Sequence, residues 1–191
     1  MAELVSYEVE GKIATISINR ADKMNALNED VIQGLRSAFR RYNDSNERCA
    51  ILCAEGDAAF SVGADIKDPP REMWQGVPGV GVVTNKPIIA CVQGYCIGGA
   101  YILVQMCDLV VAADNTIFKY PEAQVGFTGG LIAGCAARIP HKIAMEFMLA
   151  DTKKCKQMSR AAEVYAHKNF SLEVMLDEME TLFYSFCKPA R

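Results

Sequence analysis

Three separate segments contain residues whose types could stabilise or move charge during a reaction. In the first, "FSVGADIKD", Gly63 permits a tight backbone turn, and the small side chain of Ala64 leaves its own N–H open. A backbone N–H presented in this way can donate to an oxygen that gains negative charge, as in an oxyanion hole. Taken by itself, the segment fits a turn of small residues after a strand better than a site.

The second segment, "CIGGAYILVQMCD", reads as an apolar helix that opens on Gly98 and Gly99. Glycine destabilises a helix by roughly 0.8–1 kcal/mol relative to alanine, so a pair of glycines needs a physical reason. The first N–H groups of a helix have no intrahelical partner and lie at its positive end, and glycine lets a ligand approach them. The segment therefore indicates either an anion or oxyanion donor or close packing of the helix on a strand.

The third segment, "FKYPEAQVGF", places Glu122 directly after a proline and among aromatic and apolar neighbours. Poor solvation would raise the pKa of this carboxyl group and make it usable as a general acid or base near neutral pH. A glutamate on a solvent-facing loop is the simpler alternative while the segment is considered alone.

The elements that must position these segments alternate between strand and helix. Residues 5–18 predict a hairpin with its turn at Glu10-Gly11, and further strands are predicted at 49–54, 87–94 and 108–113. The run at 49–54 lacks alternation, which is typical of a strand covered on both faces. Helices intervene, and from about residue 143 the pattern is helical. The order predicts an α/β chain with right-handed crossovers.

The helix between the first hairpin and the strand at 49–54 has clear sequence signals. Asn28 can cap its N-terminus, with acidic residues following in the first turn. The helical period predicts an apolar face of Ile32, Leu35 and Phe39, and a solvent face of Arg36, Arg40 and Arg41.

Composition excludes several classes of function. The chain has 191 residues, 51% of them hydrophobic and 23% charged, with a formal net charge of -3, which predicts a globular protein and gives no support for nucleic-acid binding. No apolar run approaches the ~20 residues that span a membrane, and "MAELVSYEVEGK" does not resemble a signal peptide. The eight cysteines form no CxxC pair, so we expect no disulfide or metal site and a cytoplasmic location.

Together, four motifs resemble the crotonase superfamily, which contains the enoyl-CoA hydratases and isomerases. They are "INRADKMNALN", "FSVGADIKD", "KPIIACVQGYCIGGAYILVQMCDLVVAADNTIFKYPEAQVGF" and "GGLIAGCAARIP", and the resemblance runs from Val5 to Leu149. It implies an α/β fold, a spiral of ββα units at 1–142 with a C-terminal helical segment at 143–191. It also implies a homotrimer or dimer of trimers and an acyl-CoA thioester substrate, with no cofactor apart from the coenzyme A of that substrate.

The resemblance also implies roles for individual residues. The backbone N–H groups of Ala64 and Gly99 correspond to the family's oxyanion hole, which binds the thioester oxygen as it gains enolate charge. Glu122 corresponds to a catalytic glutamate. Four further residues are expected on the coenzyme A side of the substrate: Asp65, Ile66, Lys67 and, as a weaker candidate, Lys23.

Three features depart from the family pattern. Ile102 stands where the hydratases place a second glutamate, and water addition needs both carboxylates. The stretch after Asp68 is short, and Met73 and Trp74 either replace part of the acyl-pocket wall or cover the core. After "AMEFMLA" the chain continues at once as "DTKKCKQMSRAAEV", so either this is a truncated member or the sequence joins segments that are not adjacent in the native chain.

These observations predict an acyl-CoA enzyme of the hydratase/isomerase family that uses Glu122 as its general acid/base, with double-bond isomerisation favoured because Ile102 replaces the second carboxylate. Two alternatives stay open: an ordinary enoyl-CoA hydratase and an acyl-CoA-binding protein without activity. A hydrolase using Cys96 is a remote third, because neither His141 nor His167 lies in a segment that obviously reaches it.

Overall fold

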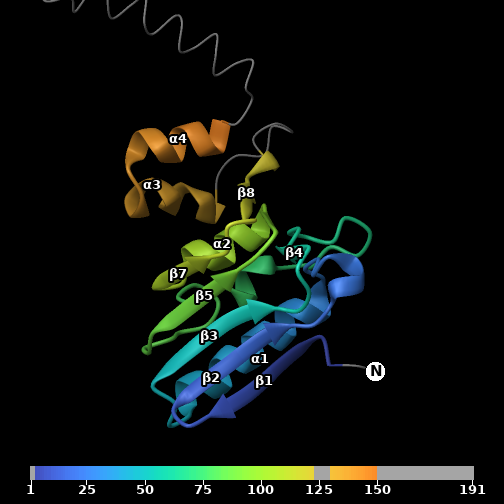
Figure 1. The fold of residues 1–191 in the computed structure, drawn as a ribbon, viewed down its shortest axis with the longest axis vertical. Helices are drawn as coiled ribbons and strands as arrows, with labels where there is room; N and C mark the ends of the chain where they lie inside the picture. Colours follow the sequence, from blue (N-terminus) through green and yellow to red (C-terminus); the bar gives the residue numbers. More distant parts are fainter. Residues whose placement is uncertain (1–2, 123–129, 150–191) are drawn as a thin grey trace, which may run out of the picture. The chain divides into compact units, whose positions relative to one another are not determined.

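The structure is a computed structural model that describes residues 3–122 and 130–149 (Figure 1). Its strands are β1 (Val5–Glu10), β2 (Ile13–Ile18), β3 (Cys49–Ala54), β4 (Ala59–Ser61), β5 (Ile88–Val92), β6 (Tyr95–Ile97), β7 (Leu109–Ala112) and β8 (Ile117–Lys119). Its helices are α1 (Glu29–Asp44), α2 (Gly99–Gln105), α3 (Cys135–Arg138) and α4 (His141–Leu149), with short 3-10 helices at Ala21–Lys23, Met73–Gly76 and Gly130–Gly134.

The strands form two sheets. The larger has five strands in the order β1-β2-β3-β5-β7, and only its β1–β2 hairpin is antiparallel. The smaller has three parallel strands in the order β4-β6-β8. The predicted hairpin, with Gly11 at a φ of 59° in its turn, and the strands predicted at 49–54, 87–94 and 108–113 are confirmed. Strands β4 and β6 of the smaller sheet were missed, because strands of three residues carry too little periodicity to be recognised.

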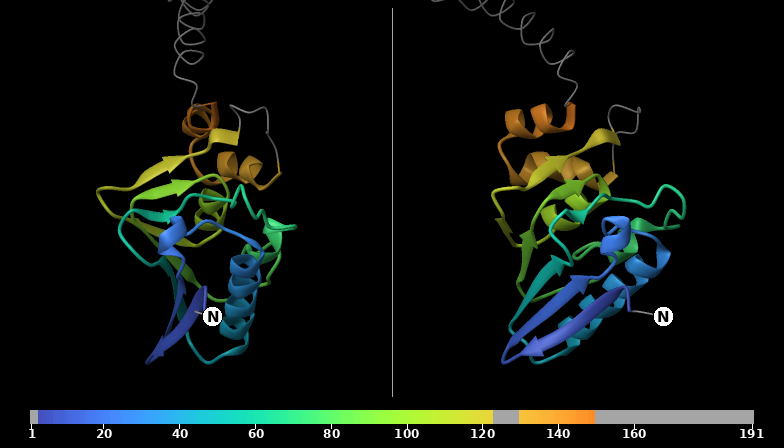
Figure 2. Two further views of the ribbon diagram at one scale, coloured as in Figure 1. Left: turned by 90° about the vertical axis from the view of Figure 1, so that its right-hand side faces the viewer. Right: turned by 45° about the vertical axis from the view of Figure 1, so that its right-hand side comes forward.

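Helix α1 lies along one face of the larger sheet (Figure 2). The Asn28 side chain caps it by accepting a hydrogen bond of 3.2 Å from the Val31 N–H, as predicted. Its buried side chains include Leu35 and Phe39, each of which stabilises the fold by roughly 1.5–3 kcal/mol relative to exposure. The prediction for Arg36 was wrong: its guanidinium is partly buried and donates to Gln75 Oε1 at 2.8 Å.

The strands of the larger sheet are covered more fully on one face than on the other, which corrects the prediction for 49–54. In β3, Ala50 and Leu52 are fully buried, whereas Ile51 and Cys53 between them are only half-buried. Burial in β5 alternates in the same way. The physical reason is that α1 packs on the first face, so the apolar run in β3 reflects strand propensity rather than two equally covered faces.

Contacts along the chain group Met1–Ala150 into one compact unit, which includes α4. The predicted boundary between residues 142 and 143 falls inside that helix. The part of the predicted helical segment that follows Leu149 lies outside the described residues. Among the helices of the described ranges, none combines the length and the apolar character needed to cross a membrane.

Candidate active site

The first predicted donor, the Ala64 N–H, follows β4 and is held by a parallel bridge to Leu27. The Leu27 N–H donates to the Gly63 carbonyl at 2.8 Å, and the Asp65 N–H donates to the Leu27 carbonyl at 2.9 Å. A parallel bridge uses the residues on either side of Ala64, so the N–H of Ala64 points away from Leu27. Ala64 is exposed, and no acceptor within the described residues bonds its N–H.

The second predicted donor lies within reach of the first. Gly63 adopts a φ of 86°, and a Cβ added to it would lie 2.7 Å from the Ile97 carbonyl oxygen and 3.3 Å from the Gly99 nitrogen. The backbones of the two segments therefore touch where Gly63 has no side chain. Because Gly99 is the first residue of α2, its N–H has no intrahelical acceptor. The structure therefore brings the segment that carries the Ala64 amide into contact with the backbone at the Gly99 amide.

Glu122 reaches the same place from the smaller sheet. Ile97 in β6 pairs with Lys119 in β8, and the Gly98 N–H donates to the Lys119 carbonyl at 2.9 Å. The carboxylate of Glu122, three residues further along, lies over Gly98: a Cβ at residue 98 would overlap its Oε1 and stand 3.4 Å from its Oε2. The absence of a side chain at Gly98 thus makes room for the carboxylate beside the two amides.

The environment of Glu122 favours its neutral form. Burial raises the pKa of Glu122 above its ordinary value, and its Oε2 is buried without a hydrogen-bond partner among the described residues. Tyr120 is buried beside it, and burial, then the Glu122 charge, raises the pKa of the Tyr120 phenol. A carboxyl group with a raised pKa accepts and releases a proton closer to neutral pH than an exposed glutamate does.

An ion pair fixes the segment that carries Ala64. Arg20 Nη1 donates to Asp65 Oδ2 at 2.7 Å and to the Ala26 carbonyl at 2.9 Å, and both charged side chains are 14% exposed. The Arg20 guanidinium holds the pKa of Asp65 below its ordinary value. Asp65 Oδ1 accepts the Lys67 N–H at 2.9 Å, so this carboxylate is occupied in shaping the loop.

Buried Asn25 ties the same region to β4. It adopts a φ of 54°, its Oδ1 accepts the Arg20 N–H at 2.9 Å, and its Nδ2 donates to the carbonyls of Glu55 and Ala59, both at 2.9 Å. Sequence reasoning missed Arg20 and Asn25 as positioning residues. Both lie in the quoted motif "INRADKMNALN", but their partners are distant in sequence, so spacing alone could not assign them a task.

The remaining residues expected on the coenzyme A side lie in or beside the loop that carries Ala64 and Asp65. Ile66 is 95% exposed, and Lys67 is exposed as well. Lys23 is exposed in the 3-10 helix at Ala21–Lys23, and the hydrogen bond of 3.2 Å from the Val62 N–H to the Met24 carbonyl sets that helix beside the loop. Their predicted contacts with coenzyme A stay predictions.

Met73 contacts the site directly. Its thioether lies against Gly99, where a Cβ would overlap both Sδ and Cε, and Leu27 Cδ1 would stand 3.8 Å away. Met73 also packs against the hydrophobic core, whereas its neighbour Trp74 is 48% exposed. Ile102, one turn into α2, is 7% exposed, so the position that the family resemblance compares with a second glutamate holds an apolar side chain inside the fold.

Cys96 does not have the properties of a nucleophile. It is fully buried in β6, and burial raises the pKa of its thiol to about 12. The thiolate, rather than the thiol, is the reactive form, so this cysteine is inert near neutral pH. The structure therefore removes the basis of the hydrolase alternative.

Comparisons with known proteins identify the family of this chain. The family described as enoyl-CoA hydratase/isomerase matches residues 8–164. A Dictyostelium discoideum protein named "Probable enoyl-CoA hydratase, mitochondrial" is 29% identical over 140 residues, 67% of this chain. The match covers 48% of that protein, so this chain spans about half the length of that curated relative.

Solved structures show the same fold. The enoyl-CoA hydratase of Mycobacterium tuberculosis H37Rv is 26% identical with a TM-score of 0.71, over 98% of this chain and 92% of that one. A carnitinyl-CoA dehydratase from Mycobacterium avium 104 is 31% identical with a TM-score of 0.66, over 78% of this chain and 61% of that one. The family match across most of the chain, with these structural likenesses, shows that the chain belongs to the enoyl-CoA hydratase/isomerase family of the crotonase superfamily.

Proposed function

We propose that this protein acts on an acyl-CoA thioester by forming an enolate at the Ala64 and Gly99 amides, with Glu122 as its general acid/base. The observation that carries the proposal is the convergence of the three segments: Gly63 against the Gly99 nitrogen, and Glu122 over Gly98. Two backbone donors and one half-buried carboxyl group are the equipment that proton transfer next to a thioester requires.

In the favoured reaction, Glu122 takes a proton from the carbon next to the thioester carbonyl of a 3-enoyl-CoA. The electron pair moves toward the thioester oxygen, where the two N–H groups stabilise the developing charge. In other enzymes the loss of one such donor slows the reaction on the order of 10²–10³-fold. Glu122 then returns the proton to the far carbon of the shifted double bond. The chemistry needs no cofactor beyond the coenzyme A carried by the substrate.

Ile102 is the reason to favour isomerisation over hydration. Water addition needs one group to activate the water and another to deliver a proton, and each is typically worth ~10²–10⁴-fold. A buried aliphatic side chain can do neither. The same observation supports the alternative of an acyl-CoA-binding protein without turnover. The contact of Met73 with Gly99 supports it too, because the thioether narrows the space in front of the Gly99 N–H, the second proposed donor.

The test is to incubate the protein with a panel of 2-enoyl- and 3-enoyl-CoA thioesters and to follow both mass and absorbance. Isomerisation changes absorbance at constant mass, and hydration adds the mass of one water. Binding measured by calorimetry without turnover, and without exchange of the α-proton in D₂O, identifies the non-catalytic alternative. Unaltered turnover in Glu122→Gln would refute the role of Glu122. Assembly as a homotrimer or dimer of trimers and a cytoplasmic location stay predictions.

A further inference from the structure

Cys53 and Cys91 occupy facing positions on neighbouring strands in the middle of the larger sheet. Strands β3 and β5 run parallel, with Ala50 opposite Ile88 and Leu52 opposite Ala90. Leu52 and Ala90 are the last paired residues, and Cys53 and Cys91 come next along their strands. Just beyond them, Gln93 Nε2 donates to the Ala54 carbonyl at 2.9 Å and joins the two segments again.

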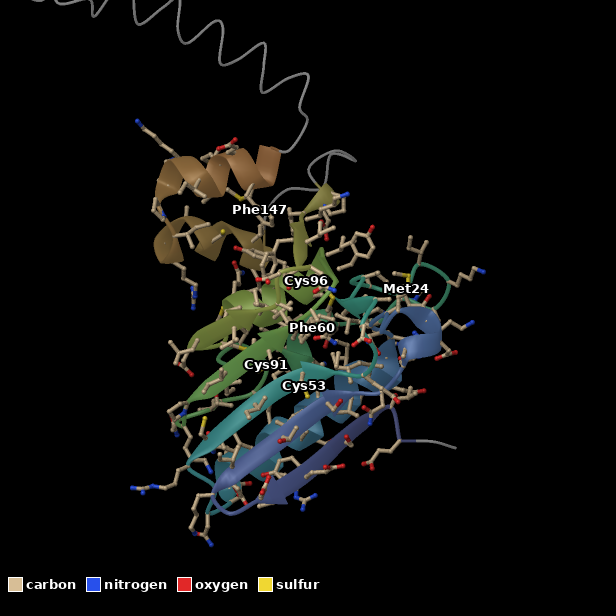
Figure 3. The ribbon with its side chains drawn as sticks, in the orientation of Figure 1. Met24, Cys53, Phe60, Cys91, Cys96 and Phe147 are labelled. Carbon is tan, nitrogen blue, oxygen red and sulfur yellow. The ribbon has the colours of Figure 1, made fainter. Side chains whose placement is uncertain are left out.

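The two thiols also share a face. Leu52 and Ala90 point into the core beneath α1, and side chains alternate along a strand, so Cys53 and Cys91 both point to the opposite face. Both are half-buried free thiols. Figure 3 labels them side by side on β3 and β5. Burial is the main cause that raises the pKa of the Cys53 thiol. The charge of the nearby Cys91 is a smaller cause in the same direction, which agrees with their proximity.

Facing positions on adjacent strands have the spacing that a disulfide needs. Neighbouring strands lie about 4.7–4.9 Å apart, within the roughly 4.4–6.8 Å between the Cα atoms of bonded cysteines. Their Cβ atoms, however, must come to about 3.8 Å, so closing the bond draws the two strands together. A disulfide under such strain is readily reduced and belongs to the labile rather than the structural kind.

We propose that Cys53 and Cys91 form a dithiol site that is oxidised reversibly by small disulfides of the glutathione type. The Cys91 thiolate attacks one sulfur of the oxidised reagent, which forms a mixed disulfide and releases one reagent thiol. The Cys53 thiol loses its proton and attacks Cys91 Sγ, which releases the second reagent thiol. The protein loses two protons and two electrons, and the reagent disulfide is reduced to two thiols.

The order of attack follows from the surroundings of the two cysteines. Cys53 Sγ donates to the Ile16 carbonyl at 3.7 Å, and burial keeps Cys53 in the thiol form, which suits it to the second, intramolecular step. Two other described cysteines, Cys96 and Cys107, are less suited to such a reaction, because burial holds both as thiols with pKa values of about 12. The inference does not depend on the proposed acyl-CoA chemistry.

The test uses the full chain, equilibrated with glutathione buffers of increasing oxidised fraction, quenched in acid and analysed by mass spectrometry. We expect loss of the mass of two hydrogen atoms, with fragmentation showing a Cys53–Cys91 link that dithiothreitol removes. In Cys53→Ser we expect a stable glutathione adduct on Cys91 instead of the link. Cys49→Ser, on the same strand and face, is the matched control and should keep it.

Two results would overturn the proposal. One is the absence of any peptide joining Cys53 to Cys91 in the wild-type chain at the most oxidising buffer. The other is a glutathione adduct that persists on Cys91 in the wild type without resolving to the link. Both results are measured on the wild-type protein, so they remain decisive even if a serine variant folds poorly.

Discussion

The carboxylate of Glu122 lies over the Cα of Gly98, in the space that a side chain at residue 98 would occupy. Gly98 also adopts a φ of 57°. Its N–H donates a hydrogen bond to the carbonyl of Lys119, three residues before Glu122. Gly98 therefore determines three features of the site: the start of α2, the hydrogen bond that attaches β8, and the position of Glu122, the proposed general acid/base.

Gly98→Ala should displace Glu122, because the added methyl group overlaps Oε1. We expect turnover of an enoyl-CoA to fall by about 10²–10⁴-fold, the range associated with one positioned acid or base. Steady-state kinetics and acyl-CoA binding should be measured together. Gly11→Ala is the matched control, since Gly11 has a φ of 59° but no atom near its Cβ position. Equal losses of turnover in the two variants would show that backbone strain, rather than Glu122, is responsible.

The pH dependence of turnover should report the raised pKa of Glu122. As a base Glu122 must be ionised, so activity should fall as the pH drops through a value above the ordinary 4.5. The measurement is the dependence of kcat/KM on pH, with enzyme stability checked at each point. An acid limb at or below 4.5 would contradict the buried environment described for this carboxyl group.

Glu122→Gln should be inactive yet more stable than the wild type near neutral pH. Because burial raises the folded-state pKa of Glu122, its stabilising contribution is complete below the unfolded-state pKa and is lost as the pH rises through the folded value. The amide does not ionise and avoids that loss. Thermal unfolding should therefore show a higher Tm for the variant near neutral pH and a vanishing difference in acid. A higher Tm for the wild type at both pH values would contradict this.

Asp65→Asn should lower kcat more than it changes KM, because it loosens the Arg20 clamp on the loop that presents the Ala64 N–H. An amide leaves the guanidinium without its ionic partner, while the bridge to Leu27 is kept. Asp68→Asn serves as the control, since Asp68 lies in the same loop and bonds Asn28 rather than Arg20. An effect confined to KM would instead place Asp65 on the substrate, as the family resemblance suggests.

Ile102→Glu should give the protein a hydration activity that we expect the wild type to lack. The change puts a carboxyl group one turn after Gly99, where the hydratases of the family have theirs, and we expect a gain of ~10²–10⁴-fold in water addition to a 2-enoyl-CoA. Because Ile102 is 7% exposed, the variant should also have a lower Tm. Ile102→Gln shares the polar burial without an ionisable group. Comparable hydration by both variants, or by the wild type, would count against the importance of Ile102.

The sequence by itself determined the class of fold and the types of group in the site. Apolar periodicity predicted the hairpin, the capped helix and the strands at 49–54, 87–94 and 108–113, because each depends on local pattern and capping. The family motifs identified Ala64, Gly99 and Glu122 as the residues to examine. The same resemblance compared Ile102 with a second glutamate, a comparison that needs no coordinates and whose catalytic consequence stays a prediction.

The tertiary structure alone decided how these groups meet. Contacts such as Gly63 with the Gly99 nitrogen, Glu122 with Gly98 and Arg20 with Asp65 join residues far apart in the sequence, and no local pattern encodes such a distance. The same holds for the burial that raises the pKa of Glu122 and makes Cys96 inert. Strand register likewise placed Cys53 and Cys91 directly after the last pair of β3 and β5, because pairing between strands is fixed by packing across the whole sheet rather than within either strand.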